Sequence, residues 1–188
     1  LSAERFHTQI EASKLAYAER DRHLADPQHV DVPVKRLLAR AHAKRLAAAI
    51  DPARAMTNVP AHLLLPHPDT TYLTVVDKDR TAVSFINSIY YGFGSARVAP
   101  KSGVVLQNRG AYFSLDPTHP NRLEPGKRPL HTLIASLAFR GDRLWQVFGC
   151  MGADGQPQIH LQAYTAMIDF GLDAQRAVSA PRWLPKPR

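Results

Sequence analysis

The chain of 188 residues has 45% hydrophobic and 21% charged side chains, a balance that fits about one globular domain and excludes a largely disordered protein. Its formal net charge is +8, but Lys and Arg are scattered among acidic residues and form no long run, so no specific nucleic-acid binding is expected. No stretch of the sequence is long and apolar enough for a membrane-spanning helix.

Metal and redox chemistry find little support in the sequence. Cys150 is the one cysteine, so no internal disulfide can form. The nine histidines include no H-E-x-x-H arrangement, and we expect neither a metal site nor a cofactor. Gly92-Phe93-Gly94 lacks the third glycine and the following helix of a dinucleotide-binding loop, and is predicted to be a turn. A chain that begins at Leu1 leaves its cellular location open.

Two helices are expected at the start of the chain. Residues 4–24 place apolar side chains at helical spacing in a charged background, and Asp26-Pro27 ends this pattern. Residues 31–51 carry a second apolar stripe that begins after Pro33, a favoured residue at the start of a helix. The prolines between residues 52 and 69 predict an extended linker.

After residue 69 the hydrophobic period becomes that of strands. "TYLTVVD" and "TAVSFINSIYY" predict a hairpin that turns at Lys78-Asp79. "GVVLQN" and a proline-rich loop from Asp116 to Pro129 follow, and "HTLIASLAFRGDRLWQVFG" predicts a second hairpin. "QPQIHLQAYTAMIDFGL" returns to helical spacing and is closed by Gly171, and "DAQRAVSAPRW" predicts a short capped helix.

This order of helices, hairpins and helices predicts an α+β fold. Both strands of the first hairpin are apolar on both faces, which favours a sheet that helices cover on each side.

Thr70, directly after Asp69 at the mouth of the first strand, is a candidate nucleophile. A threonine hydroxyl is weak unless a base stands beside it, and one solution is the residue's own backbone amine, freed by cutting the preceding peptide bond. The unperturbed pKa of such an amine is about 7.7–8.0, so it accepts a proton near neutral pH. Threonine is also simply common in strands, and the local pattern leaves both interpretations open.

Several segments show an extensive resemblance to a known family. "TTYLTVVDKDRTAVSFINSIYYGFGS", "SGVVLQNRGAYFSLDP", "PGKRPLHTL", "GCMGADGQPQIHLQ" and "SAPRW" resemble, in this order, the small subunit of the γ-glutamyltranspeptidase family, and "YAERDRHLADPQHVDVP" resembles the end of its large subunit. "QNRGAYFSLDP" and "QPQIHLQ" are more similar to the γ-glutamyltranspeptidase-like and cephalosporin-acylase-like bacterial proteins than to the glutathione-cleaving enzymes.

The resemblance implies the αββα sandwich of the N-terminal-nucleophile hydrolases, of which this chain contains a part flanked by helices. It divides the chain into residues 1–69, from the large-subunit region, and residues 70–188, from the small-subunit region. Most of the large subunit is then expected outside this chain, and this part alone is expected to be inactive.

The implied chemistry begins with self-cleavage between Asp69 and Thr70, after which Thr70 attacks an amide substrate and its own amine moves the proton. Water completes hydrolysis, or an amino acid or peptide acceptor completes transfer. The resemblance places Ser88 where the family keeps a hydroxyl beside the nucleophile. It places Gly152 and Ala153 at the Gly-Gly pair whose backbone N–H groups form the oxyanion hole.

The implied substrate-binding positions depart from those of the glutathione-cleaving enzymes. An Asn, a Gln, an Asp and two Ser are replaced here by Tyr90, Arg109, Tyr112, His131 and Thr132. The missing aspartate would hold an ammonium group, whereas Arg109 favours an anionic group through a bidentate pair. A small-molecule amide is therefore the expected partner: a γ-glutamyl or related acyl amide, or alternatively a glutaryl or cephalosporin-type acyl amide.

Two accounts of other classes stay open. The chain is alternatively an inactive fragment or degenerate homologue with a structural role. A basic nucleic-acid-binding module, in turn, predicts DNA affinity that falls steeply with salt. A homo-oligomer is compatible with the sequence.

Overall fold

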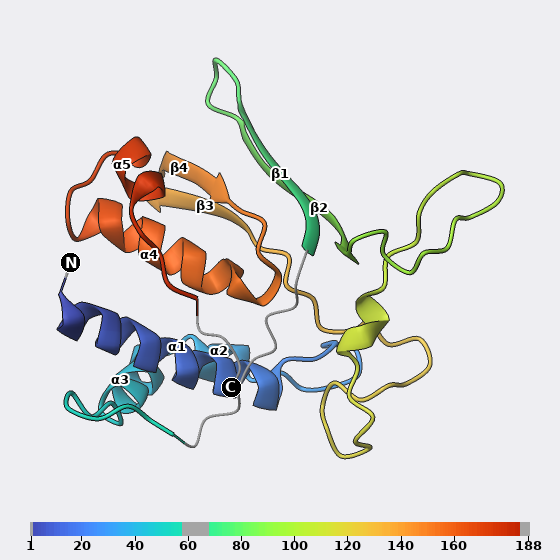
Figure 1. The fold of residues 1–188 in the computed structure, drawn as a ribbon, viewed down its shortest axis with the longest axis horizontal. Helices are drawn as coiled ribbons and strands as arrows, with labels where there is room; N and C mark the ends of the chain where they lie inside the picture. The colour runs from blue at the N-terminus through green and yellow to red at the C-terminus, as the bar shows by residue number, and fades with distance from the viewer. Residues whose placement is uncertain (1, 58–67, 185–188) are drawn as a thin grey trace. The chain divides into compact units, whose positions relative to one another are not determined.

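The computed structural model describes residues 2–57 and 68–184, which form helices and two antiparallel hairpins (Figure 1). The α-helices are α1 Ala3–His23, α2 Val34–Leu37, α3 Arg40–Ala47, α4 Gln156–Ile168 and α5 Ala174–Ser179, and the 3₁₀ helices are η1 Arg109–Tyr112 and η2 Ala153–Gly155. The strands are β1 Pro68–Val76, β2 Ala82–Tyr91, β3 Ala135–Arg140 and β4 Arg143–Gly149.

These elements belong to two compact units. Among the described residues, the first unit contains residues 2–57 and 110–131, and the second contains residues 68–109 and 132–184. Each unit therefore combines segments from both sides of the 69/70 boundary. That boundary concerns backbone cleavage and stays a prediction.

Helix α1 confirms the helix predicted over residues 4–24 and organises the first unit. The Ser2 side chain caps its first turn by accepting a hydrogen bond from the Arg5 N–H at 3.2 Å. Glu11, 1% exposed, accepts from Lys14 Nζ at 2.6 Å and from the Met56 N–H at 2.7 Å. The segment that follows α3 is thereby tied to α1.

The single helix predicted over residues 31–51 is wrong, because α2 ends at Leu37 and α3 begins at Arg40. Leu38, which the prediction placed on a buried stripe, is 81% exposed. The buried residue of α3 is His42, whose Nε2 lies 3.1 Å from a carboxylate oxygen of Glu19 on α1. The buried residue of α3 is thus polar, where the prediction expected an apolar stripe.

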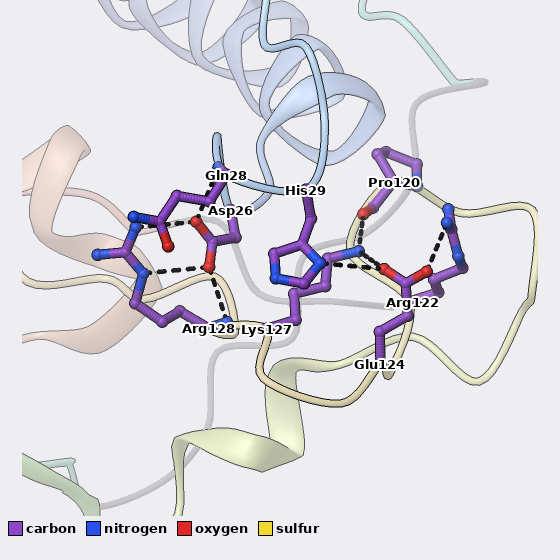
Figure 2. Close-up of polar contacts among 8 residues, drawn as sticks. All are labelled: Asp26, Gln28, His29, Pro120, Arg122, Glu124, Lys127 and Arg128. Carbon is purple, nitrogen blue, oxygen red and sulfur yellow. Dashed lines mark hydrogen bonds and ion pairs between the residues drawn. The ribbon is translucent and has the colours of Figure 1, made fainter.

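The loop between residues 116 and 129 is held to the end of α1 by Asp26 (Figure 2). This fully buried carboxylate accepts from the backbone N–H of Arg128 at 2.9 Å, from its Nε at 3.1 Å and from its Nη2 at 2.8 Å, and from the Gln28 N–H at 3.1 Å. Hydrogen bonds from Arg128 hold the pKa of Asp26 well below its ordinary value. The contact joins positions 102 residues apart in the sequence.

A second polar group beside it shapes the same loop (Figure 2). Lys127, whose side chain is fully buried, donates to the Pro120 carbonyl at 2.6 Å and to the Glu124 carboxylate at 2.9 Å. Arg122 pairs with the same carboxylate at 2.6 Å, and His29 Nδ1 lies 3.8 Å from it. These bonds compensate the cost of burying a lysine.

In the second unit, β1 and β2 confirm the first predicted hairpin. Asp77 accepts from the N–H groups of Asp79 and Thr81 at 2.9 and 2.8 Å and so closes the turn. Leu73, Val75 and Phe85 are each between 44% and 55% exposed. The described residues thus do not supply the helical cover that we expected on both faces of this sheet.

The second predicted hairpin is formed by β3 and β4, with α4 packed against β4 (Figure 1). The ring of Tyr164 on α4 stacks on Phe148 at 5.7 Å and meets Trp145 edge-on at 5.9 Å. Gly171 has a φ of 65° just after α4, as expected for the residue that closes a helix. The short capped helix is confirmed by α5, whose N-cap Asp173 accepts from the Arg176 N–H at 2.8 Å.

Replacing Asp26 with asparagine should lower the thermal unfolding midpoint of the chain, because the amide NH₂ would face the donors of Arg128. Since the folded-state pKa of Asp26 is lowered, its stabilisation is present above the ordinary value of 3.8 and is lost as the pH falls through the folded-state value. The difference between wild type and Asp26→Asn should therefore be largest near pH 7 and shrink below about pH 4. Asp31→Asn, at an exposed position, is the matched control; equal midpoints for both variants would contradict the assignment.

Candidate active site

The site is built around an irregularity at the start of the β1–β2 hairpin. Asp69 pairs with Tyr90, whereas Thr70 pairs with Ser88, so Ile89 is an extra residue that forms a β-bulge opposite the Asp69–Thr70 peptide bond. The Ile89 carbonyl accepts instead from the Asn108 N–H at 3.2 Å. Thr70 is 6% exposed. The bulge thus changes the ladder at the bond that the sequence predicts to be cut.

Three donors converge on the Ser88 hydroxyl. Thr70 Oγ1 donates to Ser88 Oγ at 2.9 Å, the Tyr90 N–H donates at 3.0 Å, and Arg109 Nη2 donates at 2.9 Å. A hydroxyl oxygen has two acceptor lone pairs, so these three donors compete. Ser88 Oγ is therefore an acceptor shared by the Thr70 hydroxyl, the Tyr90 N–H and Arg109.

Arg109 is the cation of this group, and it is buried. It is 7% exposed, its Nη1 donates to Thr132 Oγ1 at 3.3 Å, and its guanidinium lies 5.1 Å from the centre of the Tyr90 ring. Its own N–H donates to the Gln107 side chain. Tyr90, 3% exposed, has a φ of 82°, which is unusual for a residue other than glycine and is a feature found at functional sites.

Gly152 and Ala153 follow β4 and precede α4. Their φ angles are 144° and 45°, and Ala153 is buried. Within the described chain, neither backbone N–H donates a hydrogen bond, which leaves both available to an oxyanion. Gly149 lies against the Tyr72 ring, so the end of β4 approaches the strand that begins beside Thr70.

The structure brings five of the predicted site residues into one hydrogen-bonded or stacked group: Thr70, Ser88, Tyr90, Arg109 and Thr132. Tyr112 and His131 belong to the other compact unit, and their substrate-binding roles remain predictions. The side chain of Asp69 lies outside the described part of the chain, and its role in cleavage likewise remains a prediction.

Sequence reasoning missed Gln156, the first residue of α4. It is fully buried, and its Oε1 accepts from the Ile134 N–H at 3.1 Å, which fixes the segment that contains Thr132. The signal that points to it is a glutamine directly after a glycine-rich turn, at a helix start where polar residues are usually exposed.

Other chemistries have little support in the described residues. No group of three or more His, Cys, Asp or Glu lies close enough there to hold a metal ion, and no described helix could cross a bilayer. Burial raises the pKa of the Cys150 thiol to about 11, an effect that Arg182 only partly opposes, so the thiolate is scarce at neutral pH.

Comparison with known proteins places this arrangement in a class. The solved structure of the cephalosporin acylase from Bacillus halodurans matches with a TM-score of 0.87 and 40% identity, over 99% of this chain and 34% of that one. An acivicin-inhibited γ-glutamyltranspeptidase matches with a TM-score of 0.56 and 29% identity, over 61% of this chain and 66% of that one. The α+β class and the N-terminal-nucleophile-hydrolase fold are thus confirmed.

The particular family follows from the sequence. The family model described as Gamma-glutamyltranspeptidase matches residues 1–187, and the chain belongs to this family. It is 46% identical over 182 residues to the oxamate amidohydrolase proenzyme of Klebsiella pneumoniae and 43% identical over 183 residues to the glutathione hydrolase-like YwrD proenzyme of Bacillus subtilis. Each match covers 97% of this chain and 34% of the relative, so the chain spans about a third of their length.

Gly152→Ala should destabilise the protein by about 1–3 kcal/mol, because the added Cβ would lie 2.8 Å from Ile159 Cδ1 at a strained φ. Ile159→Val removes that Cδ1 atom and should restore part of the loss, leaving the backbone strain. Thermal unfolding checks this, with Gly92→Ala, where nothing lies within 4 Å of the new Cβ, as the control. An unchanged midpoint in Gly152→Ala would show that the backbone there adapts without cost.

Proposed function

We propose that this chain is part of a self-processing amidohydrolase or acyltransferase in which Thr70 is the nucleophile. The family is one of γ-glutamyltranspeptidases, glutathione hydrolases and acylases, and its curated relatives are described as proenzymes. The observation that supports the role of Thr70 is its buried hydroxyl at the start of β1, 2.9 Å from the hydroxyl of Ser88.

The first step is cleavage of the Asp69–Thr70 bond. The Thr70 hydroxyl attacks the Asp69 carbonyl, the peptide C–N bond breaks, and an ester forms while the nitrogen takes the proton. Water then hydrolyses the ester, which releases the Asp69 carboxylate and leaves Thr70 with a free amine. The bulge at Ile89 supports this assignment, because strained backbone and bulges cluster at functional sites.

The second step is acyl transfer by the mature residue. The amine of Thr70 takes the proton of its hydroxyl, which attacks the substrate amide, and the N–H groups of Gly152 and Ala153 stabilise the oxyanion. The leaving amine takes the proton, and an acyl-enzyme remains. Water completes hydrolysis, or an amino acid or peptide amine completes transfer.

The substrate class is a γ-glutamyl or related acyl amide. The named relatives act on different amides: oxamate in the Klebsiella proenzyme, and cephalosporins in the acylase from Bacillus halodurans. A glutaryl or cephalosporin-type acylase is therefore the second candidate. The exchange of an aspartate for Tyr112 supports it, because a carboxylate would be needed to hold the ammonium of a γ-glutamyl group.

Mass spectrometry of the complete gene product tests the nucleophile. Incubated protein should yield two pieces, one of which begins at Thr70, and Thr70→Ala should abolish the cleavage, because no hydroxyl remains to attack. Thr71→Ala, at the exposed neighbouring threonine, is the matched control and should be cut normally. Persistent single-chain wild type would favour the inactive-fragment account.

A release assay with glutaryl and γ-glutamyl anilides tests the substrate class in the same protein. The glutaryl compound should have the higher kcat/KM, by about tenfold, since it lacks the ammonium group that has no carboxylate partner. Oxamate hydrolysis, followed as ammonia release, extends the comparison to the smallest anionic amide. A strong preference for the γ-glutamyl compound would overturn this assignment of the substrate class.

A further inference from the structure

We propose that Arg109 is a positioning residue, which fixes the Ser88 hydroxyl beside Thr70 and whose charge keeps the Thr70 amine unprotonated at neutral pH. This inference rests on the proposed function, because the amine exists only after cleavage. It differs from the expectation that Arg109 binds an anionic substrate group, and the two roles predict different kinetics.

Asn108, the residue before Arg109, is hydrogen-bonded to β2 at two points. Asn108 binds both residues that flank Tyr90: its N–H donates to the Ile89 carbonyl at 3.2 Å, and its Oδ1 accepts from the Tyr91 N–H at 3.1 Å. The bulge in β2 is thus hydrogen-bonded to the residue that precedes η1. The backbone that carries the Arg109 side chain is therefore tied to the bulge.

Both terminal nitrogens of Arg109 are engaged with hydroxyls of the protein. Nη2 donates to Ser88 at 2.9 Å, and Nη1 donates to Thr132 at 3.3 Å. Thr132 is itself on a segment that Gln156 holds through the Ile134 N–H. A guanidinium presents its donors in a rigid fork, so this pair of bonds sets where Ser88 Oγ lies.

The positive charge of Arg109 lies close to Thr70. Ser88 Oγ lies 2.9 Å from both Thr70 Oγ1 and Arg109 Nη2, so the cation is within two hydrogen-bond lengths of the nucleophile. Arg109 is 7% exposed, and solvent screens a buried charge less than an exposed one. A nearby cation disfavours the protonated form of an amine and lowers its pKa. The neutral amine is the form that accepts the hydroxyl proton.

Few other charges face this position from the described elements. β2 has no Asp, Glu, Lys or Arg between Ala82 and Tyr91. Asp154 on η2 is a buried carboxylate of the same compact unit, and a carboxylate beside the amine would oppose the effect of Arg109. His160 on α4, whose pKa burial lowers, and the thiol of Cys150 add no charge at neutral pH.

The experiment measures kcat and KM as functions of pH in the complete gene product, with an anionic glutaryl anilide and a neutral butyryl anilide. Arg109→Met removes the charge and the fork, Arg109→Gln is a second uncharged variant should the first not fold, and Arg109→Lys keeps the charge alone. Arg97→Met, at an exposed position, is the control. Scission at position 70 is recorded first for each protein.

In Arg109→Met the acid limb of the kcat profile should move to higher pH by about one unit, for both substrates, because the amine regains its proton more easily. In Arg109→Lys the limb should stay in place while kcat falls about tenfold at every pH, because Ser88 loses the fork. In a Ser88→Ala background, Arg109→Met should still shift the limb.

A rise in KM for the glutaryl anilide alone, with kcat and the acid limb unchanged, would make Arg109 a substrate anchor and overturn the inference. An unchanged pH profile of kcat in Arg109→Met, with scission at position 70 intact, would also overturn the inference. A wild type that is never cut at position 70 would overturn the proposed function, and this inference with it.

Discussion

The hydroxyl of Ser88 is the point on which the arrangement around Thr70 depends. It receives hydrogen bonds from the Thr70 hydroxyl, the Tyr90 N–H and Arg109, which belong to β1, β2 and η1. A small hydroxyl with two lone pairs can hold three such donors close together only if the backbone brings them there. The bulge at Ile89 contributes to this, because Ile89 has no partner residue on β1 and its carbonyl accepts from the N–H of Asn108, next to Arg109.

The rest of the second unit supports this point. The end of β4 meets β1 where Gly149 lies against Tyr72, and the turn that follows carries the backbone of Gly152 and Ala153 toward the start of α4. Gln156 then fixes the segment before β3. In the first unit, the buried carboxylate of Asp26 and the exposed guanidinium of Arg128 join the segment after α1 to a loop from beyond residue 70. After the cleavage that we propose, such contacts would hold the two products together without a covalent bond.

The sequence predicted secondary structure correctly where the residue types or their spacing were typical of one element. The strand-like runs in residues 71–91 and 131–149 predicted both hairpins, and the helical spacing in residues 156–172 predicted α4. The stripe in residues 31–51 gave a wrong prediction, because Leu38 is exposed and the buried residue of α3 is the polar His42. Burial decided that case, and a periodic pattern cannot show which stripe is buried.

By itself, the sequence determined the α+β class, the order of the elements, and the candidates Thr70, Ser88, Gly152 and Ala153 through the resemblance of their motifs to one family. The tertiary structure alone decided that Arg109 binds Ser88 and Thr132, that Gln156 supports this segment, and that a bulge faces the Asp69–Thr70 bond. The physical reason is that a hydrogen bond between positions 21 or 23 residues apart depends on backbone register and burial. Neither is encoded in local spacing.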